Sequence, residues 1–122
     1  MSDMQQLRRG STTLLILSVL ADGRMYGYQI MRELEQRSEG YFTMKAALLY
    51  PALHQLEQER LVDSEWEEAP GQRRRKYYTI TQSGRTRLAS SQAEWKRFLT
   101  SLFKTLQTAP PVAPPPGQEN AP

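Results

Sequence analysis

The sequence contains no cysteine and a single histidine, His54, among its 122 residues. The lack of thiols excludes disulfides, thiolate nucleophiles and cysteine zinc sites, and one histidine cannot form a histidine-rich metal cluster. No apolar run approaches the ~20 residues that a helix needs to cross a bilayer. The polar start, residues 1–10, is not followed by a signal-peptide pattern. We therefore expect a soluble cytoplasmic protein with no metal, no other cofactor and no membrane association.

The chain also lacks the groupings of residues that enzymes use. It has no nucleophile beside a base, no glycine loop that could cradle phosphate and no carboxylate pair of evident purpose. Sixteen Lys and Arg against thirteen Asp and Glu leave a net charge of only +3, so the position of the charges matters more than their sum. We expect a protein that is not an enzyme.

Proline is scarce before residue 109 and abundant after it. Six of the eight prolines lie within residues 109–122, which carry almost no large apolar side chain. This tail is predicted to be disordered because it cannot contribute to a core. The remainder is long enough for one modest core. We expect a folded domain at residues 1–80 and a C-terminal helix at residues 81–108.

Hydrophobic spacing predicts three helices, a hairpin and a last helix. The predicted segments are helices at residues 13–21, 26–38 and 45–60, strands at residues 62–67 and 75–80, and a helix at residues 81–107. The third helix has Leu49, Leu53 and Leu56 at i, i+4 and i+7, which predicts one buried stripe. Thr43 is a possible N-cap, and Pro51 is tolerated if that helix starts only a few residues earlier.

The last helix carries an apolar seam along ~40 Å of its length. Its members are spaced by 7, 4, 3 and 4 residues, which is heptad spacing: Leu88, Trp95, Leu99, Leu102 and Leu106. Phe98 widens this seam. Such a helix extends beyond a core made of three short helices and a hairpin. We therefore expect a second chain to cover it.

This order of elements is that of a winged helix-turn-helix, in which the third helix enters the DNA major groove and the hairpin lies beside the backbone. The predicted fold is mainly α with a small β hairpin: a winged helix-turn-helix domain and a long C-terminal dimerisation helix. Six residues around the apolar stripe are the candidates for DNA contact: Lys45, Ala47, Leu48, Tyr50, His54 and Gln55. The alternative is that Leu48 and Tyr50 pack on the hairpin.

Charge along the hairpin is separated by sign. Six acidic residues lie within residues 57–68, whereas residues 72–87 hold six basic residues and no acidic one. Four of the basic residues are consecutive: Arg73, Arg74, Arg75 and Lys76. Clustered positive charge of this kind binds phosphates with release of counterions. The alternative is that the two strands neutralise each other across the ladder. Trp66, far from the apolar seam, is expected to anchor the hairpin to the core.

Several segments resemble PadR-type transcriptional regulators. They are Tyr-Gly-Tyr-Gln-Ile at residues 26–30, Leu-Tyr-Pro-Ala-Leu-His-Gln-Leu-Glu at 49–57, Glu-Trp at 65–66 and Gly-Gln-Arg-Arg-Arg-Lys-Tyr-Tyr-Thr-Ile-Thr at 71–81. The resemblance implies a homodimeric repressor that binds double-stranded DNA at a palindromic, inverted-repeat operator. Two positions depart from the family pattern: Leu48 stands where Thr or Ser is common, and Arg60 where Gly usually follows the third helix.

The short C-terminus resembles the small subfamily, some members of which bind flat aromatic drugs in a pore at the dimer interface. In those members a tryptophan of the last helix stacks on the ligand, and Trp95 occupies the corresponding place. The resemblance therefore implies a planar aromatic effector in a pore lined by Trp95, Phe98, Leu99, Leu88 and Leu102. Plain dimer packing at Trp95 is the alternative. Two rival functions also stay open, a protein-interaction dimer without DNA binding and a drug-sequestering protein without regulatory output.

Overall fold

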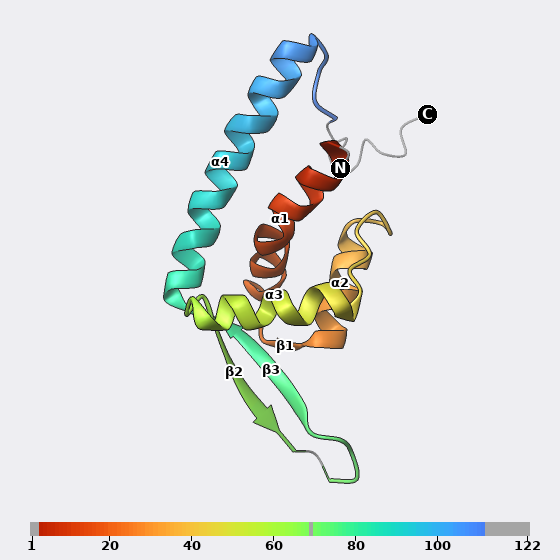
Figure 1. Ribbon diagram of the computed structural model, residues 1–122, viewed down its shortest axis with the longest axis vertical. Coiled ribbons are helices and arrows are strands. Elements are labelled where there is room, and N and C mark those ends of the chain that lie inside the picture. Colours follow the sequence, from red (N-terminus) through yellow and green to blue (C-terminus); the bar gives the residue numbers. More distant parts are fainter. Residues whose placement is uncertain (1–2, 69, 112–122) are drawn as a thin grey trace, which may run out of the picture. The chain divides into compact units, whose positions relative to one another are not determined.

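The computed structural model describes residues 3–68 and 70–111, which form three helices, a small antiparallel sheet and a long last helix (Figure 1). The elements in chain order are α1 (Asp3–Leu20), β1 (Met25–Tyr26), α2 (Gly27–Arg37), α3 (Ala46–Gln58), β2 (Val62–Glu67), β3 (Arg75–Ile80) and α4 (Gln82–Leu106). The mainly α fold class is confirmed. The predicted disordered tail lies, from residue 112 onward, outside the described residues.

One apolar core joins α1, α2, α3, the sheet and the start of α4. It consists of Ile16, Leu17, Val19, Leu20, Ile30, Leu34, Met44, Leu49, Leu53, Leu56, Leu61, Val62, Tyr78, Ile80 and Leu88. The predicted stripe of α3 is part of it, since Leu49, Leu53 and Leu56 are all fully buried. Burial of this stripe fixes which face of α3 remains in contact with solvent.

The sheet has three strands, so the prediction of a two-stranded hairpin was incomplete. β1 pairs antiparallel with β3, with Met25 opposite Tyr78 and Tyr26 opposite Tyr77, in the order β1-β3-β2. A strand of two residues is too short to show alternation in the sequence. The hairpin itself, β2 and β3, has the predicted bounds and projects beyond the helices (Figure 1). We call residues 62–80 the wing.

Both ends of α3 differ in detail from the prediction. Lys45, in extended conformation, is the N-cap residue, so the assignment of Thr43 as the cap was wrong. The C-terminal end is a Schellman motif: the Leu61 N–H donates to the Leu56 carbonyl at 2.9 Å, and the Arg60 N–H to that of Glu57 at 3.0 Å. Arg60 has a φ of 60°, so an arginine adopts the left-handed conformation that favours glycine.

The base of the wing is joined to α4 by a close backbone approach. The Thr81 hydroxyl accepts from the Gly84 N–H at 2.9 Å, which caps the helix, and donates to the Arg60 carbonyl at 2.8 Å. A Cβ added at Gly84 would overlap the Leu61 carbonyl oxygen and would lie 2.7 Å from Ile80 Cγ1. Glycine is therefore required where α4 crosses the end of the wing.

The chain divides into two compact units within α4, between Ser91 and Gln92. The first contains the three helices, the sheet and the start of α4, and the second contains the remainder of α4. Within the described residues, no helix is both long and apolar enough to span a bilayer.

Candidate functional site

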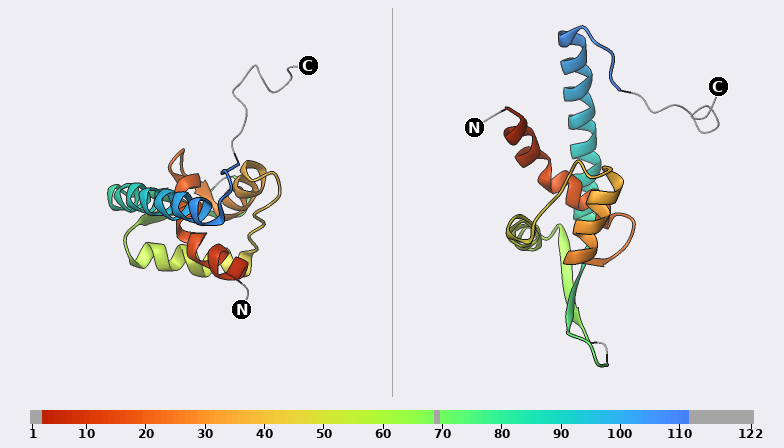
Figure 2. Two further views of the ribbon diagram at one scale, coloured as in Figure 1. Left: turned by 90° about the horizontal axis from the view of Figure 1, so that it is seen from above. Right: turned by 90° about the vertical axis from the view of Figure 1, so that its right-hand side faces the viewer.

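All six candidate residues of the third helix lie on its solvent-facing side. Lys45, Ala47, Leu48, Tyr50, His54 and Gln55 are each exposed in the chain. Figure 2 shows α3 end-on in its right-hand view, with the wing extending past it. The first compact unit therefore presents the exposed face of α3 and the wing together.

Tyr50 reaches toward the start of α2 and remains about half exposed. A Cβ added at Gly27, the first residue of α2, would overlap the Tyr50 hydroxyl. Gly27 is thus the residue that lets the Tyr50 ring lie against this helix end. Leu48 is also exposed and borders a small hollow with Leu15 and Phe42. Neither side chain is buried beneath the wing.

A groove of about 470 Å³ separates α3 from the wing. Tyr50 and His54 of α3 line one side, and Trp66, Arg74 and Lys76 of the wing line the other. Its walls combine aromatic rings with cationic groups. Those are the features that a protein uses to hold a sugar–phosphate strand, because cations neutralise phosphate and rings pack on the apolar parts of the nucleotide.

Trp66 does not anchor the wing to the core, so that expectation was wrong. Its side chain is 56% exposed. The Arg74 guanidinium lies 4.9 Å from the centroid of the indole ring, and the Lys76 ammonium lies 6.0 Å from it. The ring thus forms cation–π contacts with the basic residues of the neighbouring part of the wing. Arg74 also pairs with Glu68 at 3.3 Å, and Arg73 is exposed.

Glu57 connects α3 to the wing. Its carboxylate accepts hydrogen bonds from the Ser64 hydroxyl and, at 3.5 Å, from the Lys76 ammonium. The hydrogen bond from Ser64 lowers the pKa of Glu57, burial opposes the shift, and the nearby Lys76 charge reinforces it. Lys76 and Arg74 are both paired within the protein, but the Lys76 side chain is 31% exposed and that of Arg74 is 58% exposed, so Arg74 is the more accessible of the two to an external anion.

Two of the acidic residues of β2, Glu65 and Glu67, are held on the opposite face of the sheet by Arg24, which precedes β1. The Arg24 guanidinium pairs with Glu65 at 2.9 Å and with Glu67, and lies 4.3 Å over the Tyr77 ring. Arg75, directly across the ladder from Glu67, lies 4.5 Å over the Tyr26 ring. Glu65 and Glu67 thus pair with a residue outside the wing, whereas Glu68 pairs with Arg74 inside it, so the expected alternative of neutralisation within the wing holds only in part. No pattern in the sequence singled out Arg24.

The apolar seam of α4 is divided between the two units. Leu88 is only 8% exposed and packs in the core of the first unit. In the second unit, Trp95 and Phe98 make an edge-to-face contact with ring centroids 5.6 Å apart. Phe98 is 45% and Leu99 42% exposed, and Leu102 is half-buried. The second unit thus carries exposed apolar side chains at heptad spacing.

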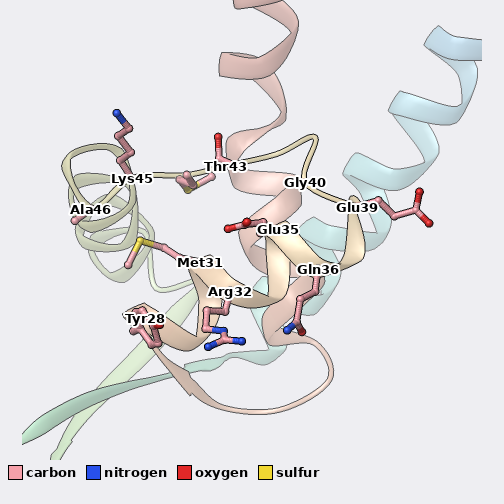
Figure 3. A pocket seen from close by; sticks show the side chains of 11 residues that line it. Tyr28, Met31, Arg32, Glu35, Gln36, Glu39, Gly40, Thr43, Lys45 and Ala46 are labelled. Atoms are coloured by element: carbon pink, nitrogen blue, oxygen red, sulfur yellow. The ribbon is translucent and has the colours of Figure 1, made fainter.

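A further hollow of about 820 Å³ lies between α2 and the start of α3. Figure 3 shows Lys45 and Glu39 at its opposite ends, pointing away from each other. Arg32 and Gln36 also point away from the apolar Met31 (Figure 3). Within residues 3–68 and 70–111, no group of three or more metal-ligating side chains is found. We assign no ligand to this hollow because its polar groups do not converge.

Comparison with known proteins agrees with this geometry. The sequence model of the transcriptional regulator PadR-like family matches residues 16–90. The transcriptional regulator Rv3488 of Mycobacterium tuberculosis is 32% identical over 89 residues, which are 73% of this chain and 79% of that protein. A PadR family transcriptional regulator from Eggerthella lenta superposes with a TM-score of 0.76 at 33% identity, covering 87% of this chain and 90% of that one. A transcriptional regulator from Clostridium thermocellum gives 0.76 at 29% identity, covering 85% and 96%.

Proposed function

The chain belongs to the PadR-like family of transcriptional regulators, and on that premise we propose that it is a homodimeric repressor that binds an inverted-repeat operator. The observation that carries the proposal is the pairing of an exposed α3 face with a basic, aromatic wing on one compact unit. A duplex bound there places α3 in the major groove and the wing beside the backbone. Repression then follows from occupation of the operator.

Within this proposal, the residues of α3 and those of the wing have different tasks. Lys45, Tyr50, His54 and Gln55 offer groups that reach base edges or phosphates, with Ala47 and Leu48 offering apolar contact. Arg73, Arg74, Arg75 and Lys76 supply the positive charge beside the backbone. The greater exposure of Arg73 and Arg74 supports their role as the principal phosphate contacts, and the lower exposure of Lys76, which pairs with Glu57, gives that lysine a smaller share.

The exposed apolar face of α4 supports a dimer. Burial of Phe98 and Leu99 against a second copy removes two large apolar side chains from water. Binding to an inverted repeat requires the two copies to present their α3 helices about one DNA turn apart, roughly 34 Å.

We also propose that Trp95, with Phe98, Leu99 and Leu102, forms a site for a planar aromatic effector in the dimer, as in the drug-binding members of the small subfamily. The edge-to-face contact of Trp95 with Phe98 supports this, since one face of an aromatic pair is suited to stacking. Release of DNA requires that the effector bind the DNA-free arrangement of the dimer more tightly than the bound one.

A salt titration tests DNA binding. Fluorescence anisotropy with a labelled duplex from upstream of the protein's own gene gives the affinity at each salt concentration. Arg73→Ala/Arg74→Ala should weaken binding to every sequence and lower the salt slope by ~0.9 for each lost contact. Lys45→Ala should instead change the preference among sequences. Arg97→Ala, which removes a positive charge from the second unit, is the control. If neither α3 nor wing substitutions alter binding, the protein-interaction alternative replaces this proposal.

A second titration tests the effector site. In a Trp66→Phe background, Trp95 is the remaining tryptophan and its emission reports on added planar aromatic compounds. Quenching together with weaker operator binding supports the proposal. Quenching with unchanged operator affinity would leave ligand sequestration as the function of the site.

A further inference from the structure

The wing carries as many negative charges as positive ones. Residues 62–80 contain four acidic and four basic residues, so the formal net charge of the wing is zero. A neutral hairpin is not attracted to phosphate unless its charges are separated in space. The proposed contact of the wing with DNA therefore requires that its positive and negative charges be held apart.

Two of the four acidic residues are covered from outside the wing. Arg24 pairs with both Glu65 and Glu67, which are remote from it in sequence. Its guanidinium is held over the Tyr77 ring, which lies opposite Glu65 in the ladder. These carboxylates therefore lie on the outer face of the sheet.

The opposite face of the sheet carries the groups that face α3. Trp66 and Lys76 alternate with Glu65 and Glu67 along the strands, and they line the groove with Arg74. Because successive side chains of a strand point to opposite faces, Trp66 and Lys76 lie on the face away from Glu65 and Glu67, whereas Arg75, which also lines the groove, lies opposite Glu67 on the acidic face. Only Arg24 binds both acids from another segment in the part of the chain that the structure describes.

We propose that Arg24 is a positioning residue for DNA binding, which holds and partly neutralises the two carboxylates of β2 so that the wing presents net positive charge to the duplex. The ion pairs are solvent-exposed, so they contribute little to the stability of the fold. Their consequence is electrostatic. Without Arg24, two carboxylates lie uncompensated within a Debye length of the phosphates.

The test is a charge-rescue cycle on the full-length chain, with a labelled 30-base-pair duplex of arbitrary sequence as the probe. Arg24→Met should raise Kd about tenfold at low salt, because uncovered like charges repel phosphate. Adding Glu65→Gln/Glu67→Gln to Arg24→Met should restore the affinity. The Kd of this triple variant should lie within about twofold of the Kd of Glu65→Gln/Glu67→Gln alone. Arg97→Met, the same substitution in the second unit, should leave Kd nearly unchanged.

Each outcome separates this inference from the proposed function. If Arg73→Ala/Arg74→Ala weakens binding but Arg24→Met does not, the role of Arg24 is overturned and DNA binding by the wing stands. If neither variant weakens binding, the proposed function fails as well. If Arg24→Met weakens binding and removal of the acids gives no rescue, Arg24 acts through packing on Tyr77 and charge masking is overturned. The Tm of Arg24→Met should lie within a few degrees of that of the wild type. If Arg24→Met does not fold, Glu65→Gln/Glu67→Gln alone must still strengthen DNA binding for the inference to survive.

Discussion

Gly84→Ala should destabilise the protein, although alanine is the better helix former. At an exposed helix position this change stabilises by about 0.5–1 kcal/mol, because glycine loses more backbone entropy on folding. Here the added Cβ would overlap the Leu61 carbonyl oxygen and press on Ile80. The carbonyl cannot rotate away, since it accepts the Thr81 N–H at 3.1 Å. Overpacking costs about 1–3 kcal/mol, and an overlap with fixed backbone places this site at the upper end of that range. After the gain in helix propensity is subtracted, a net loss of about 2 kcal/mol is expected.

Gly27→Ala provides a matched contrast. Its Cβ would also overlap another group, but that group is the hydroxyl end of Tyr50, which is half exposed and can turn toward solvent. We expect Gly27→Ala to cost less than about 1 kcal/mol, within the range of ordinary surface changes. The change should weaken DNA binding, because it displaces an aromatic side chain of the proposed interface.

Urea unfolding of the two variants and the wild type, at one protein concentration because dimerisation contributes to stability, measures the difference. A loss of 2 kcal/mol corresponds to a fall in Tm of roughly 8–16 °C for a domain of this size. Ser83→Ala, at the neighbouring exposed position, is the control and should be neutral. A Gly84→Ala protein as stable as the wild type would refute the close approach between α4 and the wing.

Three further changes have defined outcomes. Arg60→Gly should raise the free energy of unfolding in urea by up to about 1 kcal/mol, because glycine relieves the strain of the left-handed conformation. Arg60→Ala should leave it unchanged, and equal effects of the two substitutions would contradict this explanation. Folding lowers the pKa of Glu57, so the stability it contributes is fully present above the ordinary value near 4.5 and is lost as the pH falls through the lower folded value. Glu57→Gln should therefore flatten the acid limb of a stability–pH curve below that pH, and an unchanged limb would exclude this role. Leu99→Glu should give a monomer in sedimentation analysis with the fold of the first unit intact, and a persistent dimer would place the interface elsewhere.

Helix periodicity and strand alternation sufficed to predict most of the architecture. The buried stripe of α3 and the bounds of both wing strands follow from local spacing, because burial of one face repeats with the period of the element. β1 could not be predicted in this way, because its two residues form a strand only by pairing with β3. The N-cap of α3 was also predicted wrongly. Threonine is a good capping residue, but Thr43 lies upstream of Lys45, which directly precedes Ala46 and is the N-cap.

Exposure of the α3 candidates was predictable from the same stripe, whereas the partners of the wing charges were not. The pairing of Arg24 with Glu65 depends on the register of β1 against β3 and on the side of the sheet that each strand presents. Trp66 illustrates the converse. A tryptophan in a strand is expected in a core, and only the three-dimensional arrangement shows that its neighbours are cations. Long-range pairs of this kind leave no local signal.

Pro51 gives α3 an uneven stiffness. As a helical residue without an N–H, it cannot donate to the carbonyl of Ala47, so the hydrogen-bond ladder is interrupted between the first turn and the rest. Bending or fraying of that first turn therefore costs less free energy than the same distortion farther along α3, where the hydrogen-bond ladder is continuous and the leucines are buried. Lys45, Ala47 and Leu48 lie on this compliant turn. The protein can thus adapt its leading contacts to the local width and tilt of the groove it enters, while the packed part of α3 keeps its orientation.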